Sequence, residues 1–267
     1  MYLFTLYLLP QKLRVSFLDV GQGDAILIQT PSGKQMLIDG GVSNSVMSKI
    51  SDKMFYFDKD IDVLVATHPD ADHITGLIPV LEKYFVGTII TSPLTGETSI
   101  SRDLDQHILK EGSSVHVAKG GDEINFHDGV IAYVVYPLTS SAGSIVKDTN
   151  DVSVSVVVVY GDHSFLLTGD LSTYKESELF LQKIPEPVTV YKAGHHGSKY
   201  SSGETLLSYI KPEYVVISAG RDNSYGHPHN ETVERIKKFS KEIISTIDRG
   251  TITFVTDGKT IILDTEK

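Results

Sequence analysis

The stretch "VATHPDADHITGL", residues 65–77, places two histidines and two aspartates within the six positions from His68 to His73. Such side chains are costly to crowd together unless a cation lies between them. The run before them, "IDVLVAT", is apolar almost throughout, which is typical of a strand buried on both faces. The residues after them, 74–85, have a helical spacing of apolar side chains. The stretch therefore predicts a strand, a metal-binding loop and a helix, in that order.

The spacing inside this loop predicts two metal positions rather than one. In extended chain, residues i and i+2 point the same way, so His68 and Asp70 can reach one point. Asp72 and His73 lie at the turn into the helix and can reach a second point nearby. Two cations about 3.5–4 Å apart can share a bridging water and a bridging carboxylate. An acidic, solvated loop is the alternative interpretation of the motif.

Further polar residues also follow strand-like runs directly. Asp170 follows "FLLTG" and is the natural bridging carboxylate, while His195 and His196 follow "VYKAG" and offer one further ligand. Asn150 or Asp151, just before "VSVSVVVVYG", can complete the first metal position. Each group alone is also compatible with an ordinary turn or a capping loop. Together, at the ends of strands of a rigid sheet, they favour one shared site.

Strands dominate both halves of the chain, with helices interspersed. In the first half, "LRVSFLDV", "DAILIQT" and "KQMLIDG" are predicted strands separated by turn residues. "SRDLDQHILKEG" predicts a helix that ends at Gly112. The second half has a similar pattern, with seven strand-like runs and three predicted helices. This pattern predicts an α+β protein in which two sheets pack face to face with helices outside.

Composition limits the partners. The formal net charge of −10 argues against broad, non-specific binding of nucleic acid, although bound metal cations can supply local positive charge. The chain has no cysteine, which excludes disulfide-linked partners and zinc–thiolate sites. Any metal is therefore held by histidine, carboxylate or backbone groups.

The first twelve residues are predicted to stand apart from the domain. "MYLFTLYLLP" is apolar for nine residues but too short to span a bilayer. It also lacks the basic region and the cleavage site of a signal peptide. Residues 1–12 are interpreted as a first strand, an apolar tail or the stump of a membrane segment, and residues 13–267 as a single hydrolase domain.

The motifs, taken in order, resemble a known family. His68-x-Asp70-x-Asp72-His73, "LLTGD" and "GHHGS" resemble the metallo-β-lactamase fold superfamily. That resemblance implies an αββα four-layer sandwich of two mixed β-sheets with a binuclear metal site along one edge. With "FLDVGQGDAILI", "LIDGG" and "SYGHPH" added, the chain is most similar to the C-terminal hydrolase domain of the ComEC competence-protein family. That family implies a membrane DNA-uptake channel whose hydrolase domain degrades one strand of the DNA.

The resemblance also implies roles for individual residues. It assigns the metal ligands to the histidines and carboxylates already singled out, with the choice between the last two histidines open: His68, Asp70, Asp72, His73, Asp170 and His195 or His196. Asp70 stands where many members have a histidine, and Asn150 and Asp151 stand where another ligand histidine is expected. Oxygen in place of nitrogen shifts the preference toward Mn²⁺ or Mg²⁺ and away from an all-nitrogen zinc site.

Other residues are expected to support the metals or the substrate. Asp39 in "LIDGG" resembles a carboxylate that orients a ligand histidine, as metal sites usually require. Ser198 and His227 are predicted to contact a phosphate oxygen or to protonate the leaving group. Asp19 and Asp24 are interpreted as shaping the hairpin beside the site. Asp70 and Asp72 can also steer the attacking water, which makes them catalytic candidates as well as ligands.

We therefore expect a hydrolase with two divalent metal ions (Mn²⁺ or Zn²⁺, with Mg²⁺ as a third option). Its expected reaction is cleavage of DNA phosphodiesters by a metal-activated water. One alternative is a hydrolase of a small substrate such as a phosphocholine ester, a cyclic dinucleotide or a lactone. Another is a non-catalytic, degenerate scaffold domain. A membrane channel domain in a longer protein is an expected partner, which would put the chain at a membrane or outside the cytoplasm. A free-standing relative would be cytoplasmic.

Overall fold

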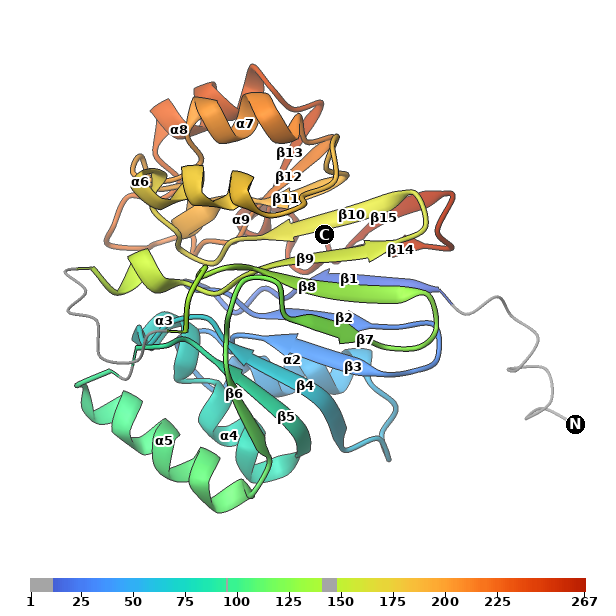
Figure 1. The fold of residues 1–267 in the computed structure, drawn as a ribbon, viewed down its shortest axis with the longest axis vertical. Coiled ribbons are helices and arrows are strands. Elements are labelled where there is room, and N and C mark those ends of the chain that lie inside the picture. The colour runs from blue at the N-terminus through green and yellow to red at the C-terminus, as the bar shows by residue number, and fades with distance from the viewer. Residues whose placement is uncertain (1–11, 95, 141–147) are drawn as a thin grey trace, which may run out of the picture.

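Two β-sheets packed face to face form the centre of the computed structural model, which describes residues 12–94, 96–140 and 148–267 (Figure 1). The predicted apolar tail lies outside these residues, apart from Lys12. Helices cover the outer face of each sheet, which gives four layers. The predicted α+β sandwich of two mixed sheets is confirmed. No helix in the described part of the chain is long and apolar enough to cross a membrane.

The first sheet has eight strands, antiparallel from β15 to β3 and parallel from β3 to β6. In spatial order they are β15 (Ile261–Thr265), β14 (Ile252–Thr256), β1 (Leu13–Phe17), β2 (Ile26–Gln29), β3 (Gln35–Ile38), β4 (Asp60–Ala66), β5 (Phe85–Thr91) and β6 (Ser114–Val117).

The second sheet has seven strands and a similar plan, parallel from β13 to β10 and antiparallel from β10 to β7. In spatial order they are β13 (Glu242–Ser245), β12 (Tyr214–Ile217), β11 (Val190–Lys192), β10 (His163–Leu167), β9 (Ser155–Tyr160), β8 (Val130–Tyr136) and β7 (Glu123–Asn125). Each sheet thus has one antiparallel and one parallel part.

Apolar side chains from the facing strands fill the space between the sheets. Phe254 lies at the centre, with its ring edge-on to Phe17 of the first sheet and Phe165 of the second, both at 6.2 Å between ring centroids. All three rings are fully buried. Burying such a side chain contributes about 1.5–3 kcal/mol, so this layer holds the two sheets together.

Helices pack on the outer faces through two further apolar clusters. On the first sheet they are α2 (Ser45–Lys53), α3 (Ala71–Ile74), α4 (Leu77–Lys83) and α5 (Ser99–Glu111). On the second sheet they are α6 (Thr173–Glu176), α7 (Glu204–Ile210), α8 (Asn230–Lys237) and α9 (Thr246–Arg249), with short 3₁₀ turns η1 (Thr149–Val152), η2 (Ser177–Leu181) and η3 (Gly194–Gly197). As predicted, α5 ends at Gly112, whose φ of 75° is the left-handed conformation that glycine adopts readily.

The parallel strands of the two sheets determine where the loops that carry the polar motifs meet. The carboxyl ends of β3 and β4 in the first sheet, and of β10, β11 and β12 in the second, open along the same edge of the sandwich, the side on which Figure 1 shows α3 and α6. In sheets of this kind, ligand sites form in the crevice outside the carboxyl ends of the strands. The polar motifs all follow these strands directly, so the fold brings them together.

Candidate metal centre

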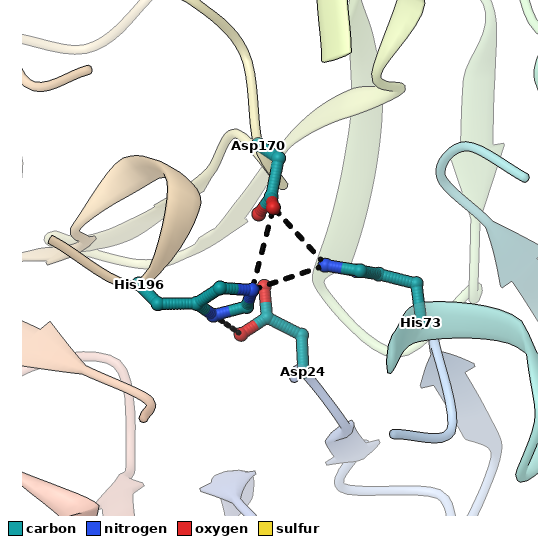
Figure 2. Close-up of side chains that lie close together, drawn as sticks. All are labelled: Asp24, His73, Asp170 and His196. Carbon is teal, nitrogen blue, oxygen red and sulfur yellow. Dashed lines mark hydrogen bonds and ion pairs between the residues drawn. The ribbon is translucent and has the colours of Figure 1, made fainter. Parts of the chain in front are cut away.

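Asp170 lies at the centre of the polar residues that the loops bring together (Figure 2). Its Oδ2 atom is 3.2 Å from Nε2 of His73 and 3.3 Å from Nε2 of His196. The Nε2 atoms of His195 and His68 are 3.8 and 4.0 Å from the same oxygen. Four histidines from two loops, those after β4 and β11, therefore point one nitrogen each at a single buried carboxylate.

The far side of two of these rings is fixed by neighbouring oxygens. Nδ1 of His73 is 2.7 Å from Oδ2 of Asp39, and Nδ1 of His68 is 2.9 Å from Oγ1 of Thr67. Thr67 in turn donates its backbone N–H and its hydroxyl to the two oxygens of Asp39, at 2.9 and 2.7 Å. Asp39 thus fixes both rings, directly or through Thr67, and leaves their Nε2 atoms facing the centre, as in ligand histidines of metal sites.

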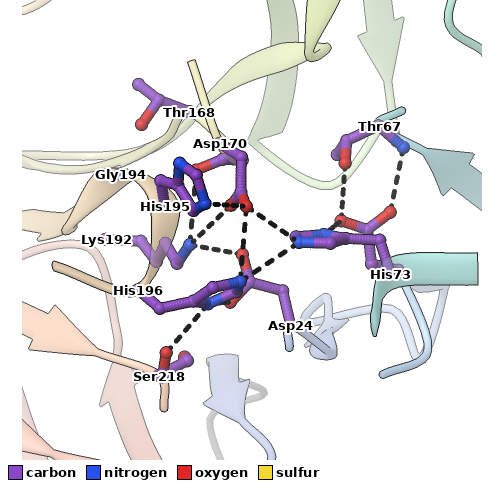
Figure 3. A network of polar contacts seen from close by, with 12 residues as sticks. Asp24, Thr67, His73, Thr168, Asp170, Lys192, Gly194, His195, His196 and Ser218 are labelled. Atoms are coloured by element: carbon purple, nitrogen blue, oxygen red, sulfur yellow. Dashed lines mark hydrogen bonds and ion pairs between the residues drawn. The ribbon is translucent and has the colours of Figure 1, made fainter. Parts of the chain in front are cut away.

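His196 is held in the same way from the second sheet. Its Nδ1 lies 3.0 Å from the carbonyl oxygen of Ser218, which follows β12 (Figure 3). Its Nε2 lies 3.3 Å from Oδ2 of Asp72. His196 is buried, whereas the side chain of His195 remains 27% exposed. The structure therefore places His196 inside the cluster and His195 on its open side.

Two groups of side chains form around Asp170. His68 and Asp70 lie on one side, with Nε2 of His68 3.8 Å from Oδ2 of Asp70. His73, Asp72 and His196 lie on the other side. Asp170 therefore contacts both groups of side chains, and the two metal positions expected from the loop spacing stay a prediction.

Thr149, which the sequence did not single out, holds Asp70. Its hydroxyl donates to Oδ1 of Asp70 at 2.7 Å. Of the neighbouring candidates, Asp151 accepts a hydrogen bond from the hydroxyl of Ser172, and the buried Oδ1 of Asn150 has no hydrogen-bond partner among the described residues. The η1 turn therefore reaches the cluster through Thr149.

Asp24 and Lys192 also belong to the cluster, although Asp24 was expected only to shape a hairpin and Lys192 was not predicted. Both are fully buried and form an ion pair behind His196, where Oδ1 of Asp24 is 3.4 Å from Nδ1. Lys192 also lies 3.6 Å from Oδ1 of Asp170 and donates to the carbonyl oxygen of Gly169 at 3.3 Å (Figure 3). Asp24, His73, Asp170 and His196 can all place one ligand atom within 4.8 Å of the others. Because Asp24 faces Lys192 and the Nδ1 side of His196, it supports the cluster from behind.

The positive backbone φ angles of Asp39, His195 and His196 are 59°, 47° and 55°. Non-glycine residues seldom adopt this left-handed conformation, and each such residue costs about 1–3 kcal/mol when the conformation is sparsely populated. Gly23 also has a positive φ, and a Cβ atom there would collide with the carbonyl oxygen of Asp72. The surrounding packing imposes these conformations exactly where the polar loops converge.

Charge in the cluster is strongly negative. Burial disfavours the charged form of His73, yet Asp170 and Asp39 outweigh it and raise the pKa of His73 well above its usual value. Burial likewise opposes charge on His196, but Asp170 and Asp24 raise its pKa to about 10. Burial, followed by the neighbouring His73, lowers the pKa of His68 to about 4. A cation attracted by these aspartates would displace the protons of His73 and His196. Metal binding would therefore release protons into solution.

The residues present fit a metal. Among the buried side-chain atoms without a hydrogen-bond partner in the described residues are Nε2 of His68 and Oδ1 of Asp170, both in the cluster. Leaving such atoms unpaired costs free energy, and a divalent cation would satisfy them. Histidine nitrogen and carboxylate oxygen are suitable ligands for zinc, manganese and iron.

The remaining candidates lie at the margin. Ser198 is buried, and its Oγ accepts a hydrogen bond from the backbone N–H of Tyr200 at 3.3 Å. The ring of His227 lies 5.2 Å from that of His195, and burial, with the charge of His195, lowers its pKa to about 4. Asn223 fixes its backbone, because its amide accepts from His227 N–H and donates to His227 C=O.

Comparison with known proteins agrees with the architecture. A family model described as the metallo-beta-lactamase superfamily matches residues 18–221. Among solved structures, CmlA, a diiron β-hydroxylase from Streptomyces venezuelae, is similar with a TM-score of 0.56 and 13% identity, covering 88% of this chain and 53% of that one. Zn²⁺-bound PqqB from Methylobacterium extorquens has a TM-score of 0.53 and 10% identity, covering 84% and 85%. At these identities the two structures show the fold alone.

Curated relatives include a ComE operon protein and a competence protein. ComE operon protein 3 of Bacillus subtilis and competence protein ComA of Neisseria gonorrhoeae are each 29% identical to this chain. The alignments cover 94% and 90% of this chain but 34% and 32% of the relatives, so the chain spans about a third of their length. The similarity predicted from the motifs is confirmed.

Proposed function

The chain belongs to the metallo-β-lactamase superfamily, and we propose that it is a binuclear metal-dependent phosphodiesterase that cleaves DNA. The observation that carries the proposal is the division of ligands around Asp170, whose Oδ2 faces four histidine nitrogens. Similarity to competence proteins supports DNA as the substrate.

In this proposal each metal takes its ligands from one side of Asp170. His68 and Asp70 hold the first, with His195 beside them, while Asp72, His73 and His196 hold the second. Carboxylates on both sides favour Mn²⁺ or Mg²⁺ more than an all-histidine site would, and Zn²⁺ remains compatible. When bound, the two cations would activate water at neutral pH and offset negative charge at phosphorus.

Other residues of the chain hold the metal ligands in position and contact the substrate. Asp39 and Thr67 keep His68 and His73 in the orientation that exposes Nε2, and Thr149 keeps Asp70 in place. His227, neutral at pH 7 with a pKa of about 4, can donate an N–H hydrogen bond to a phosphate oxygen. Transfer of a proton to the leaving oxygen would require the substrate's charge to raise that pKa.

A small phosphodiester is the second candidate substrate. The observation that favours it is the net charge of −10, which opposes association with a long polyanion. A lactone or a phosphocholine ester would use the same activated water.

Cleavage assays with purified protein separate these candidates. Labelled single-stranded and double-stranded DNA would be incubated with Mn²⁺, Mg²⁺ or Zn²⁺, beside bis-p-nitrophenyl phosphate as a minimal diester. Asp170→Ala should abolish turnover and bound metal, while Asp264→Ala, at an exposed position of β15, should change neither. Turnover of the small diester with intact DNA would move the assignment to small substrates. Full metal content and activity in Asp170→Ala would overturn the binuclear centre.

A further inference from the structure

Three tyrosines lie exposed on the loops beside the metal centre. Tyr174, Tyr200 and Tyr225 have relative exposures of 78%, 64% and 63%. Each belongs to the second half of the chain: Tyr174 to α6, Tyr200 to the loop after His195 and His196, and Tyr225 to the loop after β12. Large aromatic rings that are exposed to solvent next to a candidate hydrolytic site indicate a ligand-binding surface.

A chain of contacts connects Tyr225 to the metal centre. Its ring is stacked on His227, with 5.7 Å between centroids and 19° between planes. His227 lies 5.2 Å from the ring of His195, whose Nε2 faces Asp170 at 3.8 Å. The exposed face of Tyr225 is therefore two aromatic rings away from the central carboxylate.

The contacts continue in the other direction to Tyr200 and Tyr174. His227 lies 5.0 Å, ring to ring, from His229, whose Nδ1 accepts a hydrogen bond from Lys199 N–H at 3.3 Å. The next residue, Tyr200, accepts at its carbonyl oxygen a hydrogen bond from Thr173 N–H at 2.8 Å. Tyr174 follows directly in the chain, so hydrogen bonds and ring contacts connect the segments that carry the three exposed tyrosines, which we call the tyrosine strip.

Positive charge accompanies two of these rings. Lys199 lies 5.1 Å from the ring centroid of Tyr200, and Lys175 lies 5.3 Å from that of Tyr174. Lys175 is also paired with Glu178 at 2.7 Å. In a chain with a net charge of −10, exposed rings with adjacent lysines form a surface on which stacking, supported by local charge, would dominate binding.

We propose that the strip of Tyr174, Tyr200 and Tyr225 is a stacking platform for the bases of single-stranded DNA next to the phosphodiester that is cleaved. This inference rests on the proposed function and specifies the form of its substrate. Bases of a single strand are free to stack on aromatic rings, and such stacking tolerates any sequence. In a duplex the bases are already stacked on each other, so the platform favours a single strand.

Binding assays test the platform without relying on catalysis. Fluorescence anisotropy would be measured with a labelled, phosphorothioate-linked strand of about 12 nucleotides, within the usual range of single-strand sites. An abasic strand of the same length and linkage removes the bases but keeps the charge. We expect the wild-type protein to bind the base-bearing strand more tightly than the abasic strand or the duplex.

Substitutions then locate the effect. Tyr200→Ala and Tyr225→Leu should each weaken binding of the base-bearing strand at least about 5-fold, the lower end for loss of one stacked base. Neither should change binding of the abasic strand, and Tyr200→Phe should retain wild-type affinity. Tyr56→Ala is the matched control, because Tyr56 is 81% exposed but precedes β4, at the end of that strand away from the metal centre.

The outcomes separate the platform from the proposed function. Equal affinity for the base-bearing and abasic strands, unchanged affinity in both tyrosine variants, or a similar loss in Tyr56→Ala would overturn the platform. Cleavage of DNA by the wild-type protein in those cases would leave the phosphodiesterase standing. Wild-type protein that neither binds nor cleaves DNA with any of the three cations would overturn both.

Discussion

Replacing Lys192 by methionine tests the buried charge balance of the site. The Lys192 side chain is fully buried and pairs with Asp24, which is equally buried, between strand β11 of one sheet and the β1–β2 turn of the other. Its ammonium also lies 3.6 Å from Oδ1 of Asp170. Methionine fills a similar volume but carries no charge, so the substitution leaves Asp24 buried without its partner.

The expected loss of stability is large for one substitution. Breaking a buried ion pair by removing one partner costs about 3–5 kcal/mol. For 267 residues, an unfolding entropy of about 2.1 cal/mol/K per residue gives about 0.56 kcal/mol/K. The melting temperature should therefore fall by about 5–9 °C.

Differential scanning calorimetry of protein freed of divalent cations measures this fall. The double variant Lys192→Met/Asp24→Asn removes both charges and should recover much of the lost stability, because neither unpaired charge remains. Lys238→Met is the matched control: its pair with Glu204 at 3.0 Å is exposed to solvent, so its loss should change stability little. The reasoning is refuted if Lys192→Met loses no more stability than Lys238→Met, or if the double variant is no more stable than the single one.

Three further substitutions test Asp39 and His227 of the site and the buried Glu176 of α6. Asp39→Asn should lower metal affinity about 10- to 100-fold, measured by isothermal titration with Mn²⁺, because it weakens the hold on His73; unchanged affinity would contradict that role. His227→Ala should lower turnover more than metal content, whereas equal loss in assays of both would identify His227 as a ligand. Burial raises the pKa of Glu176 to about 7, so its contribution to stability is present below about pH 4.5 and is lost as pH rises through 7. Wild-type stability should accordingly fall between about pH 4.5 and 7 relative to Glu176→Gln in thermal melts, and parallel curves would exclude that contribution.

The two-sheet architecture was predictable because its signals are local. Buried strands such as β4 appear as apolar runs, and the helix α5 ends at a glycine that adopts a left-handed conformation. Polar residues that follow directly after strands gather at one edge whenever the strands are parallel, so the sequence also predicted that Asp170 would meet the loop after β4. Resemblance to a family added the four-layer αββα order of two mixed sheets, which periodicity alone does not specify.

Contacts between distant segments were not predictable in the same way. Thr149 and Asp70, or Asp24 and Lys192, meet only because two sheets pack against each other. A buried lysine within an apolar strand such as "VTVYKAG" is a usable signal, because an unpaired ammonium there would be costly. Its partner, however, could have been any of several aspartates.

The sequence by itself determined which residue types gather at the site, because strand ends and short-range spacing place them there. It also determined that the ligand set is nitrogen and oxygen, since the chain has no cysteine. The tertiary structure decided that His196 is buried while the side chain of His195 stays partly exposed, because both have left-handed backbones and only the packed surroundings orient their rings. It also decided that Asp24 pairs with Lys192, because side chains so far apart in the chain meet only after both sheets have formed and packed.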